Sequence, residues 1–92
     1  MSRYFVEIKK PAQEDLKALS KNEPKAYQKA LALIAELYDH PRTGTGKPEQ
    51  LKGGDGMLWS RHISKKHRLV YEIFEYLVLV EVLTACGHYG DK

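Results

Sequence analysis

The sequence predicts an α+β domain of order β-α-α-β-β-β, in which a two-helix hairpin packs on a twisted antiparallel sheet. Three observations predict this class. The amino-terminal segment alternates in polarity, two segments then carry apolar residues at helical spacing, and the carboxy-terminal half contains short apolar strands. With 92 residues, 42% of them hydrophobic, the chain suits a single domain over 1–92 and leaves nothing for a second one.

The amino-terminal half is expected to supply one strand and both helices. Alternating polarity over 3–9 predicts a strand with one face on the core. A short helix should follow, because Pro11 suits a first turn and the apolar residues Ala12, Leu16 and Leu19 recur at helical spacing. Asn22 is then expected to cap a second helix that runs to Tyr38.

The carboxy-terminal half is expected to form a meander. Residues 40–56 are rich in Pro, Gly, Thr and Lys and predict a long loop, a kind of segment that is usually functional or disordered. Strands are expected over 57–63 and 67–73, joined by the polar turn 64–66. Residues 77–83 are almost continuously apolar, which predicts a central strand covered on both faces.

Positive charge is concentrated in the loop and in the hairpin that follows it. Between His40 and Tyr71 there are seven Lys or Arg and two acids, so this window carries +5 while the rest of the chain sums to −2. A basic surface favours polyanionic partners. RNA and an acidic protein would both be attracted to it, so charge alone leaves the two open.

One acid in this window, Glu49, is a candidate catalytic residue. A carboxylate beside cationic groups suits a protein that grips a phosphodiester and removes a proton from it. Pairing of the hairpin strands should bring Arg68 close to Arg61 or His62, but only one of these two can share its face, because adjacent strand residues point to opposite sides. Glu49 can also be interpreted as a solvated surface acid, and Arg68 as part of a structural salt bridge.

Other classes of protein are disfavoured by the sequence. The single cysteine, Cys86, excludes an internal disulfide, and no stretch approaches the length of a membrane span, so we expect a cytoplasmic protein without membrane contact. Gly44–Lys47 lacks the spacing of a nucleotide-binding loop. The histidines and Cys86 lack the paired spacing of a zinc site, and we expect neither a metal nor a cofactor.

Four motifs together resemble one known family. They are Gly-x-Gly-Lys-Pro-Glu-x-Leu-Lys at 44–52, Trp-Ser-Arg at 59–61, His-Arg-Leu-Val-Tyr at 67–71 and His-Tyr at 88–89. In this order and spacing the chain resembles the YoeB/Txe branch of the RelE-like toxins of bacterial toxin–antitoxin systems. The resemblance covers nearly the whole chain.

The resemblance implies a toxin that inhibits translation. It implies a ribosome-dependent endoribonuclease, an mRNA interferase that enters the ribosomal A site and cleaves the mRNA there by metal-independent acid–base chemistry. The implied partners are the ribosome, mRNA and a cognate antitoxin that folds on the basic cleft. Operator DNA would be contacted only through the antitoxin complex, and the resemblance leaves open whether the toxin is a monomer or a homodimer.

The resemblance also implies roles for single residues. Glu49 matches the family's general base, Arg68 its phosphate-binding arginine, His88 its general acid and Tyr89 the aromatic residue near the carboxy terminus. The expected contacts with RNA or the ribosome are Lys47, Lys52, Arg61, His62, Lys65 and Lys66.

This chain departs from the family pattern at three places. His62 stands where relatives commonly have a second arginine, Ala85–Gly87 replaces a usual basic residue, and 90–92 follow the His-Tyr pair. The alternative function is a non-catalytic interaction protein on the same scaffold, either a ParE-like toxin directed at gyrase or a DNA-binding corepressor. The Glu/Arg/His set favours the nuclease, because those relatives lack it.

Overall fold

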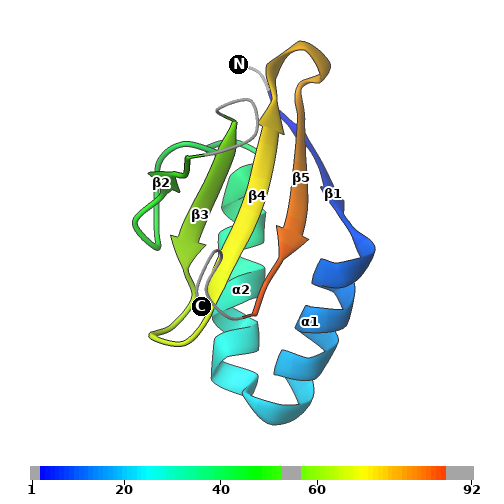
Figure 1. Cartoon of the computed structure of the whole chain (residues 1–92), viewed down its shortest axis with the longest axis vertical. Helices are drawn as coiled ribbons and strands as arrows, with labels where there is room; N and C mark the ends of the chain where they lie inside the picture. Colours follow the sequence, from blue (N-terminus) through cyan, green and yellow to red (C-terminus); the bar gives the residue numbers. More distant parts are fainter. Residues whose placement is uncertain (1–2, 53–56, 87–92) are drawn as a thin grey trace.

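The computed structural model describes residues 3–52 and 57–86 of the chain. Within them two helices lie on one side of a sheet, which confirms the predicted α+β class (Figure 1). The elements are, in chain order, β1 (Phe5–Ile8), α1 (Lys10–Asn22), α2 (Pro24–Leu37), β2 (Glu49–Gln50), β3 (Leu58–His62), β4 (Arg68–Phe74), a 3-10 turn (Glu75–Leu77) and β5 (Leu79–Thr84).

The sheet has the strand order β1-β5-β4-β3-β2. The β3–β4 and β4–β5 pairs are antiparallel, as the hairpin signals predicted. The β2–β3 pair, which the sequence did not predict, is antiparallel as well. β1 pairs parallel to β5, from Phe5 opposite Leu79 to Ile8 opposite Val82. A parallel pair needs a long connection, and the whole of the chain between β1 and β5 supplies it. The sheet is therefore mixed, with its one parallel pair among the described strands at the β1 edge.

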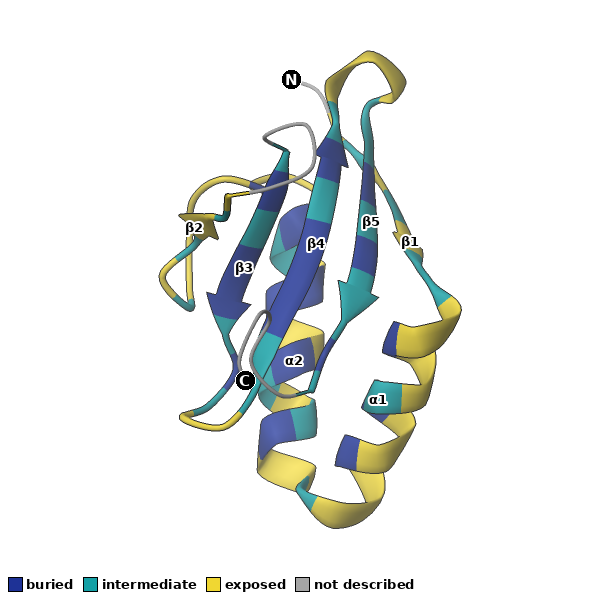
Figure 2. Ribbon diagram, viewed as in Figure 1, coloured by how far each residue is buried: buried dark blue, intermediate teal, exposed yellow. Residues whose placement is uncertain are grey.

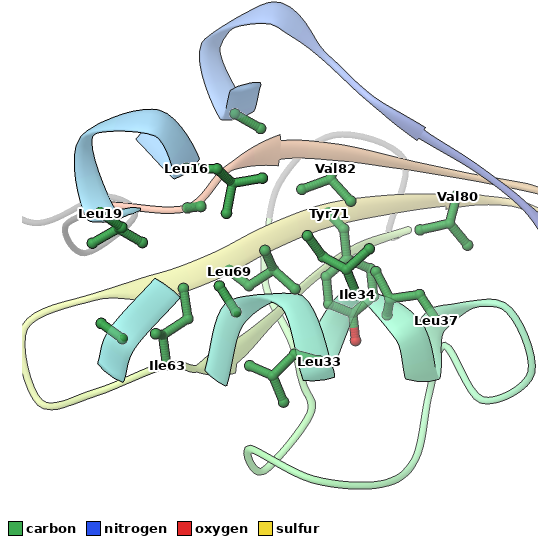
Figure 3. Packing of buried hydrophobic residues seen from close by; sticks show 14 of the residues in the cluster. Leu16, Leu19, Leu33, Ile34, Leu37, Ile63, Leu69, Tyr71, Val80 and Val82 are labelled. Carbon is green, nitrogen blue, oxygen red and sulfur yellow. The ribbon is translucent and has the colours of Figure 1, made fainter. Parts of the chain in front are cut away.

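The core lies between the helices and the inner face of the sheet (Figures 2 and 3). In β4, the side chains of Leu69, Tyr71 and Ile73 are fully buried in this cluster. They meet Leu33 and Leu37 of α2. Since side chains alternate along a strand, Arg68, at the start of β4, belongs to the outer face, away from the helices. The alternation in β4 thus decides which residues are left for the outer face.

The helix boundaries differ from the sequence prediction. α1 has 13 residues and is not short, and Asn22 is its last residue. The position before α2 is held by Glu23, so the prediction of Asn22 as the N-cap was wrong. The reason is the tight connection, because Pro24 already begins α2. Neither helix is long and apolar enough to cross a membrane.

Two further predictions in the carboxy-terminal half need correction. The last strand begins at Leu79 and not at residue 77, because the 3-10 turn and the left-handed backbone of Val78, with φ of 50°, precede it. It is not covered on both faces: Val80 and Val82 are buried, while their neighbours are only half-buried. The predicted long loop 40–56 contains the short strand β2.

Candidate active site

β2 fixes the position of Glu49. In the β2–β3 ladder Glu49 lies opposite Ser60 and Gln50 lies opposite Trp59. The backbone N–H of Leu51 donates to the carbonyl of Leu58 at 2.7 Å and extends this pairing. Because residues that face each other in an antiparallel ladder share a side of the sheet, Glu49 and Ser60 both belong to the outer face.

Arg68 reaches the same place from the other side of β3. It lies opposite His62 in the β3–β4 ladder, which decides that His62, and not Arg61, shares its face. Its Nη1 atom is 3.4 Å from Ser60 Oγ and 3.9 Å from Glu49 Oε1. The structure therefore brings together three residues that the sequence proposed, Glu49, His62 and Arg68, around a serine that it did not.

The hydrogen-bonding capacity of Arg68 is largely unused. A guanidinium has five N–H donors. Among the residues that the structure describes, the buried Nε atom has no acceptor, and the bond from Nη1 to Ser60 is long. The ion pair with Glu49 is also long, and the Glu49 side chain is 61% exposed, so it contributes little to stability. An arginine with unpaired donors on an open surface is suited to hold an anion, and a phosphate oxygen fits its geometry.

Arg61 points the other way, into the protein, and the prediction that it contacts RNA was wrong. Its side chain has no exposed surface. Its Nη1 atom is 2.7 Å from Glu36 Oε1, its Nη2 atom donates to the carbonyl of Thr43 at 2.8 Å, and its Nε atom donates to Tyr71 Oη at 3.1 Å. The carbonyls of His40 and Thr45 accept further bonds. Strand alternation turned this arginine inward, where these oxygens neutralise it.

The contacts of Arg61 organise the loop that precedes β2. We call Arg61, Glu36 and Tyr71, together with the loop segment 40–46, the Arg61 cluster. Tyr71 Oη donates to the carbonyl of Pro41 at 2.7 Å, and the backbone N–H of Thr45 donates to Glu36 Oε1 at 2.9 Å. Hydrogen bonding from Thr45, followed by that from Arg61, holds the pKa of Glu36 below its usual value. The Arg61 cluster thus ties α2, β3 and β4 to the loop that carries Glu49.

The remaining predicted residues fall into two groups. Lys47, Lys52 and Lys65 are exposed, as contacts with RNA require. Lys66 is exposed too, but its Nζ atom lies 3.4 Å from Glu23 Oε2, a carboxylate oxygen that also lies 2.8 Å from His67 Nε2. The predicted general acid His88 and the aromatic Tyr89 lie outside the described residues.

Sequence reasoning missed Glu36 and Ser60. Glu36 did carry a signal, since it is the one acid within the α2 sequence and stands next to the helix end, where the dipole disfavours a negative charge. Such a local conflict indicates a tertiary partner. Ser60 stood within the Trp-Ser-Arg motif, but nothing in the sequence gave it a role beside Arg68. Among residues 3–52 and 57–86, no three potential ligand side chains gather as a metal site would need.

Comparison with known proteins identifies the family. A family model described as YoeB-like toxin of bacterial type II toxin–antitoxin systems matches residues 8–89. The toxin YoeB of Streptomyces coelicolor is 39% identical over 69 residues, which cover 74% of this chain and 82% of that protein. The toxin YoeB of Escherichia coli K12 is 39% identical over 57 residues, covering 62% of this chain and 64% of that protein.

Solved structures agree with this match. The YoeB/ParE toxin of Agrobacterium tumefaciens, 29% identical, superposes with a TM-score of 0.83 over 92% of this chain and 99% of its own. The YoeB dimer of Staphylococcus aureus, also 29% identical, superposes with a TM-score of 0.80 over 96% of this chain and 100% of its own. The YoeB–YefM complex from that organism gives a TM-score of 0.76. The resemblance seen in the motifs is confirmed: this chain belongs to the YoeB-like toxin family of bacterial type II toxin–antitoxin systems.

Proposed function

We propose that this protein is a ribosome-dependent endoribonuclease that cleaves mRNA in the A site and so inhibits translation. The observation that supports the proposal most is the Glu49–Arg68 pair, a carboxylate 3.9 Å from a guanidinium with unused donors, on the outer face of the sheet. A base and a phosphate-binding group side by side are what cleavage by the 2′-hydroxyl requires. Membership of the YoeB-like toxins points in the same direction.

In the proposed reaction the RNA supplies its own nucleophile. Glu49 takes the proton of the 2′-hydroxyl while O2′ attacks the adjacent phosphorus, and the bond between phosphorus and O5′ breaks. His88 gives a proton to the departing O5′, and Tyr89 is the aromatic residue that follows it in the sequence. The products are a 2′,3′-cyclic phosphate and a 5′-hydroxyl, so protons and electrons balance with side chains alone. Each acid–base group is worth about 10²–10⁴-fold in rate.

Arg68 stabilises the charge that develops on the phosphate. The Nη donors of this one-quarter exposed side chain would bind the nonbridging oxygens. Ser60 Oγ, 3.4 Å from Nη1, holds the guanidinium in place without neutralising it. Lys47, Lys52, Lys65 and Lys66 would bind the RNA backbone or the ribosome around this centre, together with His62, the register partner of Arg68.

The proposed partners follow from the reaction and the family. A ribosome-dependent toxin works in the cytoplasm and needs a cognate antitoxin that covers the basic face. The YoeB–YefM complexes of Staphylococcus aureus support an antitoxin partner, and the YoeB dimer of that organism supports a homodimer. Contact with operator DNA would be made through the antitoxin complex.

The test compares two Glu→Gln variants on ribosomes programmed with a defined mRNA. Glu49→Gln removes the base and keeps the size, so cleavage in the A site should fall by about 10²-fold or more. The control is Glu14→Gln, an exposed position on α1, which should cleave at the wild-type rate. New mRNA ends are mapped by primer extension. Near-normal cleavage by Glu49→Gln would remove the base role from this residue, and intact mRNA with inhibited gyrase would favour the ParE-like alternative.

A further inference from the structure

A hollow of about 410 Å³ lies at the end of β3, where His62, the register partner of Arg68, is one of its lining residues. It is formed by three elements: Lys29 comes from α2, Gly46 and Lys47 from the loop before β2, and His62 and Lys65 from the end of β3 and its turn. We call it the lysine pocket. Lys29 was not among the basic residues to which the sequence drew attention, because it lies on a helix far from the motifs.

The charges of the lysine pocket are uncompensated. The described residues that line it include no Asp or Glu. Within the described part of the chain none of the ammonium groups of Lys29, Lys47 and Lys65 has an ion-pair partner, whereas Lys66 in the same turn lies 3.4 Å from Glu23. Like charges that line one pocket repel one another. An anion in the pocket would remove this repulsion.

The backbone at the pocket is tightly fixed. His62 N–H donates to the carbonyl of Gly46 at 2.7 Å. A Cβ on Gly46, which has φ of +86°, would lie 3.0 Å from the carbonyl oxygen of His62 and 3.1 Å from Leu33 Cδ2. Lys47 follows with φ of 53°, a left-handed conformation that is unfavourable for a side chain of this kind. Such conformations concentrate at functional sites, and here the fixed backbone holds Lys47 at the pocket.

The lysine pocket and the proposed scissile phosphate are separated by two residues along β3. His62 lies opposite Arg68 in the ladder, and Ser60, two residues earlier in β3, lies opposite Glu49. Two residues of a strand span about 7 Å. Successive phosphates of an extended RNA strand are spaced on the same scale. A strand whose scissile phosphate is held by Arg68 would bring a neighbouring phosphate to the lysine pocket if it passes over the end of β3 at His62 toward Lys29 of α2.

We propose that the lysine pocket binds a second RNA phosphodiester, the neighbour of the scissile phosphate on the same strand. Lys29, Lys47 and Lys65 would hold its oxygens through charge-assisted hydrogen bonds. The inference rests on the proposed function, since it takes the strand path from Arg68. A phosphate of ribosomal RNA has the same chemistry, and the two sources are separated by experiment.

The first experiment measures binding and not cleavage. The probe is a single-stranded RNA oligonucleotide with a 2′-deoxy substitution at the scissile nucleotide, so that it cannot be cut. A triple variant, Lys29→Gln, Lys47→Gln and Lys65→Gln, is compared with a matched triple on α1, Lys10→Gln, Lys17→Gln and Lys21→Gln, which are exposed. The slope of log affinity against log salt should be about 0.7 shallower for the pocket triple, the loss of one phosphate contact, and unchanged for the control.

A second arm identifies the phosphate. When the neighbouring linkage of the oligonucleotide is replaced by a neutral methylphosphonate, the wild-type protein should bind it more weakly. The affinity of the pocket triple should not change. A slope change seen on vacant ribosomes but not on the oligonucleotide would instead assign the pocket to ribosomal RNA. If the pocket triple does not fold, the same binding measurements are made with the single variant Lys65→Gln, because Lys65 is in an exposed turn.

Equal slopes for the two triples in both arms would overturn the proposal. So would a pocket triple that weakens binding of an acidic antitoxin peptide and leaves RNA binding intact. Failure of the proposed function is seen separately, because Glu49→Gln should bind the oligonucleotide with the wild-type slope. If Glu49→Gln still cleaves, the nuclease assignment to Glu49 fails, whatever the slopes are.

Discussion

Two arginines on neighbouring strands of one hairpin have opposite environments. Arg61 has no exposed surface, and its donors are met by a carboxylate, a phenol and loop carbonyls. The Arg68 side chain is one-quarter exposed, its Nε atom has no acceptor among the described residues, and its Nη1 atom is 3.9 Å from Glu49 Oε1. The same side chain therefore stabilises the fold on the inner face of the sheet and is available to a ligand on the outer face.

The difference teaches that partners, and not charge, separate a structural arginine from a binding one. Buried ion pairs persist only if the remaining donors are also satisfied. Arg61 meets this condition through the loop carbonyls, and its cost of burial is offset locally. Arg68 does not meet it, because its Nε atom has no acceptor among the described residues and its ion pair with Glu49 is long.

The largest effect is expected from Arg61→Met, which removes the centre of the Arg61 cluster. Glu36 would lose its guanidinium and the carbonyls of Thr43 and Thr45 would lose a donor. Breaking a buried pair in this way costs about 3–5 kcal/mol. The free energy of unfolding, measured by urea denaturation, should fall by about 3 kcal/mol, since Glu36 keeps some contact with water.

The control for this prediction is the double variant Glu36→Gln/Arg61→Met. Removing both charges leaves no buried carboxylate without a partner, so part of the stability should return. A loss of less than about 1 kcal/mol in Arg61→Met would mean that Arg61 does not hold the loop.

Arg68→Gln should give the reverse result, and its effect is the next largest. The unfolding free energy should change by no more than about 0.5 kcal/mol, because the exposed ion pair with Glu49 is long. Single-turnover cleavage on programmed ribosomes should fall by about 10²–10³-fold, the usual cost of one charge-stabilising donor. If the variant instead lost stability and kept the rate for each folded molecule, the contrast between the two arginines would be wrong.

Much of the fold could be predicted from sequence, because helical and strand periodicities survive in single segments. Hairpin geometry anticipated that Arg68 lies beside Arg61 or His62, and the family resemblance implied that Glu49 and Arg68 share one site. The strand β2, which positions Glu49, was not predicted. The inward direction of Arg61 could not. In Trp59–His62 both phases of the alternation look amphipathic, and only the position of Glu36, 25 residues earlier, decides between them. The predicted element ends near Asn22 and Leu79 were wrong, because tight turns there override the local propensity of the sequence.

Acid should weaken the Arg61 cluster. The pKa of Glu36 in the folded state lies below its ordinary value of 4.5, chiefly because of hydrogen bonding from Thr45 and Arg61. Its stabilisation is therefore complete above pH 4.5 and is lost as the pH falls through the folded-state pKa. Urea denaturation at a series of pH values gives the free energy of unfolding of both proteins. The difference in this free energy between wild type and Glu36→Gln should become smaller below pH 4.5.

The comparison with Glu36→Gln isolates this one carboxyl. The pKa of Glu23 is also lowered, mainly by hydrogen bonding to His67, and its effect on acid stability is common to both proteins. A difference that stayed constant from neutral to acidic pH would show that Glu36 binds protons equally in the folded and unfolded states.

The smallest effect is expected from Ser60→Ala, which tests how Arg68 is held. Ser60 is 2% exposed, and its Oγ accepts a bond of 3.4 Å from Arg68, long for a hydrogen bond and correspondingly weak. Its loss should cost about 1 kcal/mol at the transition state, or about fivefold in single-turnover cleavage, with little change in the unfolding free energy. The double variant Ser60→Ala/Arg68→Gln should be no slower than Arg68→Gln alone, because Ser60 acts through Arg68. Additive losses would assign Ser60 a direct contact with the RNA.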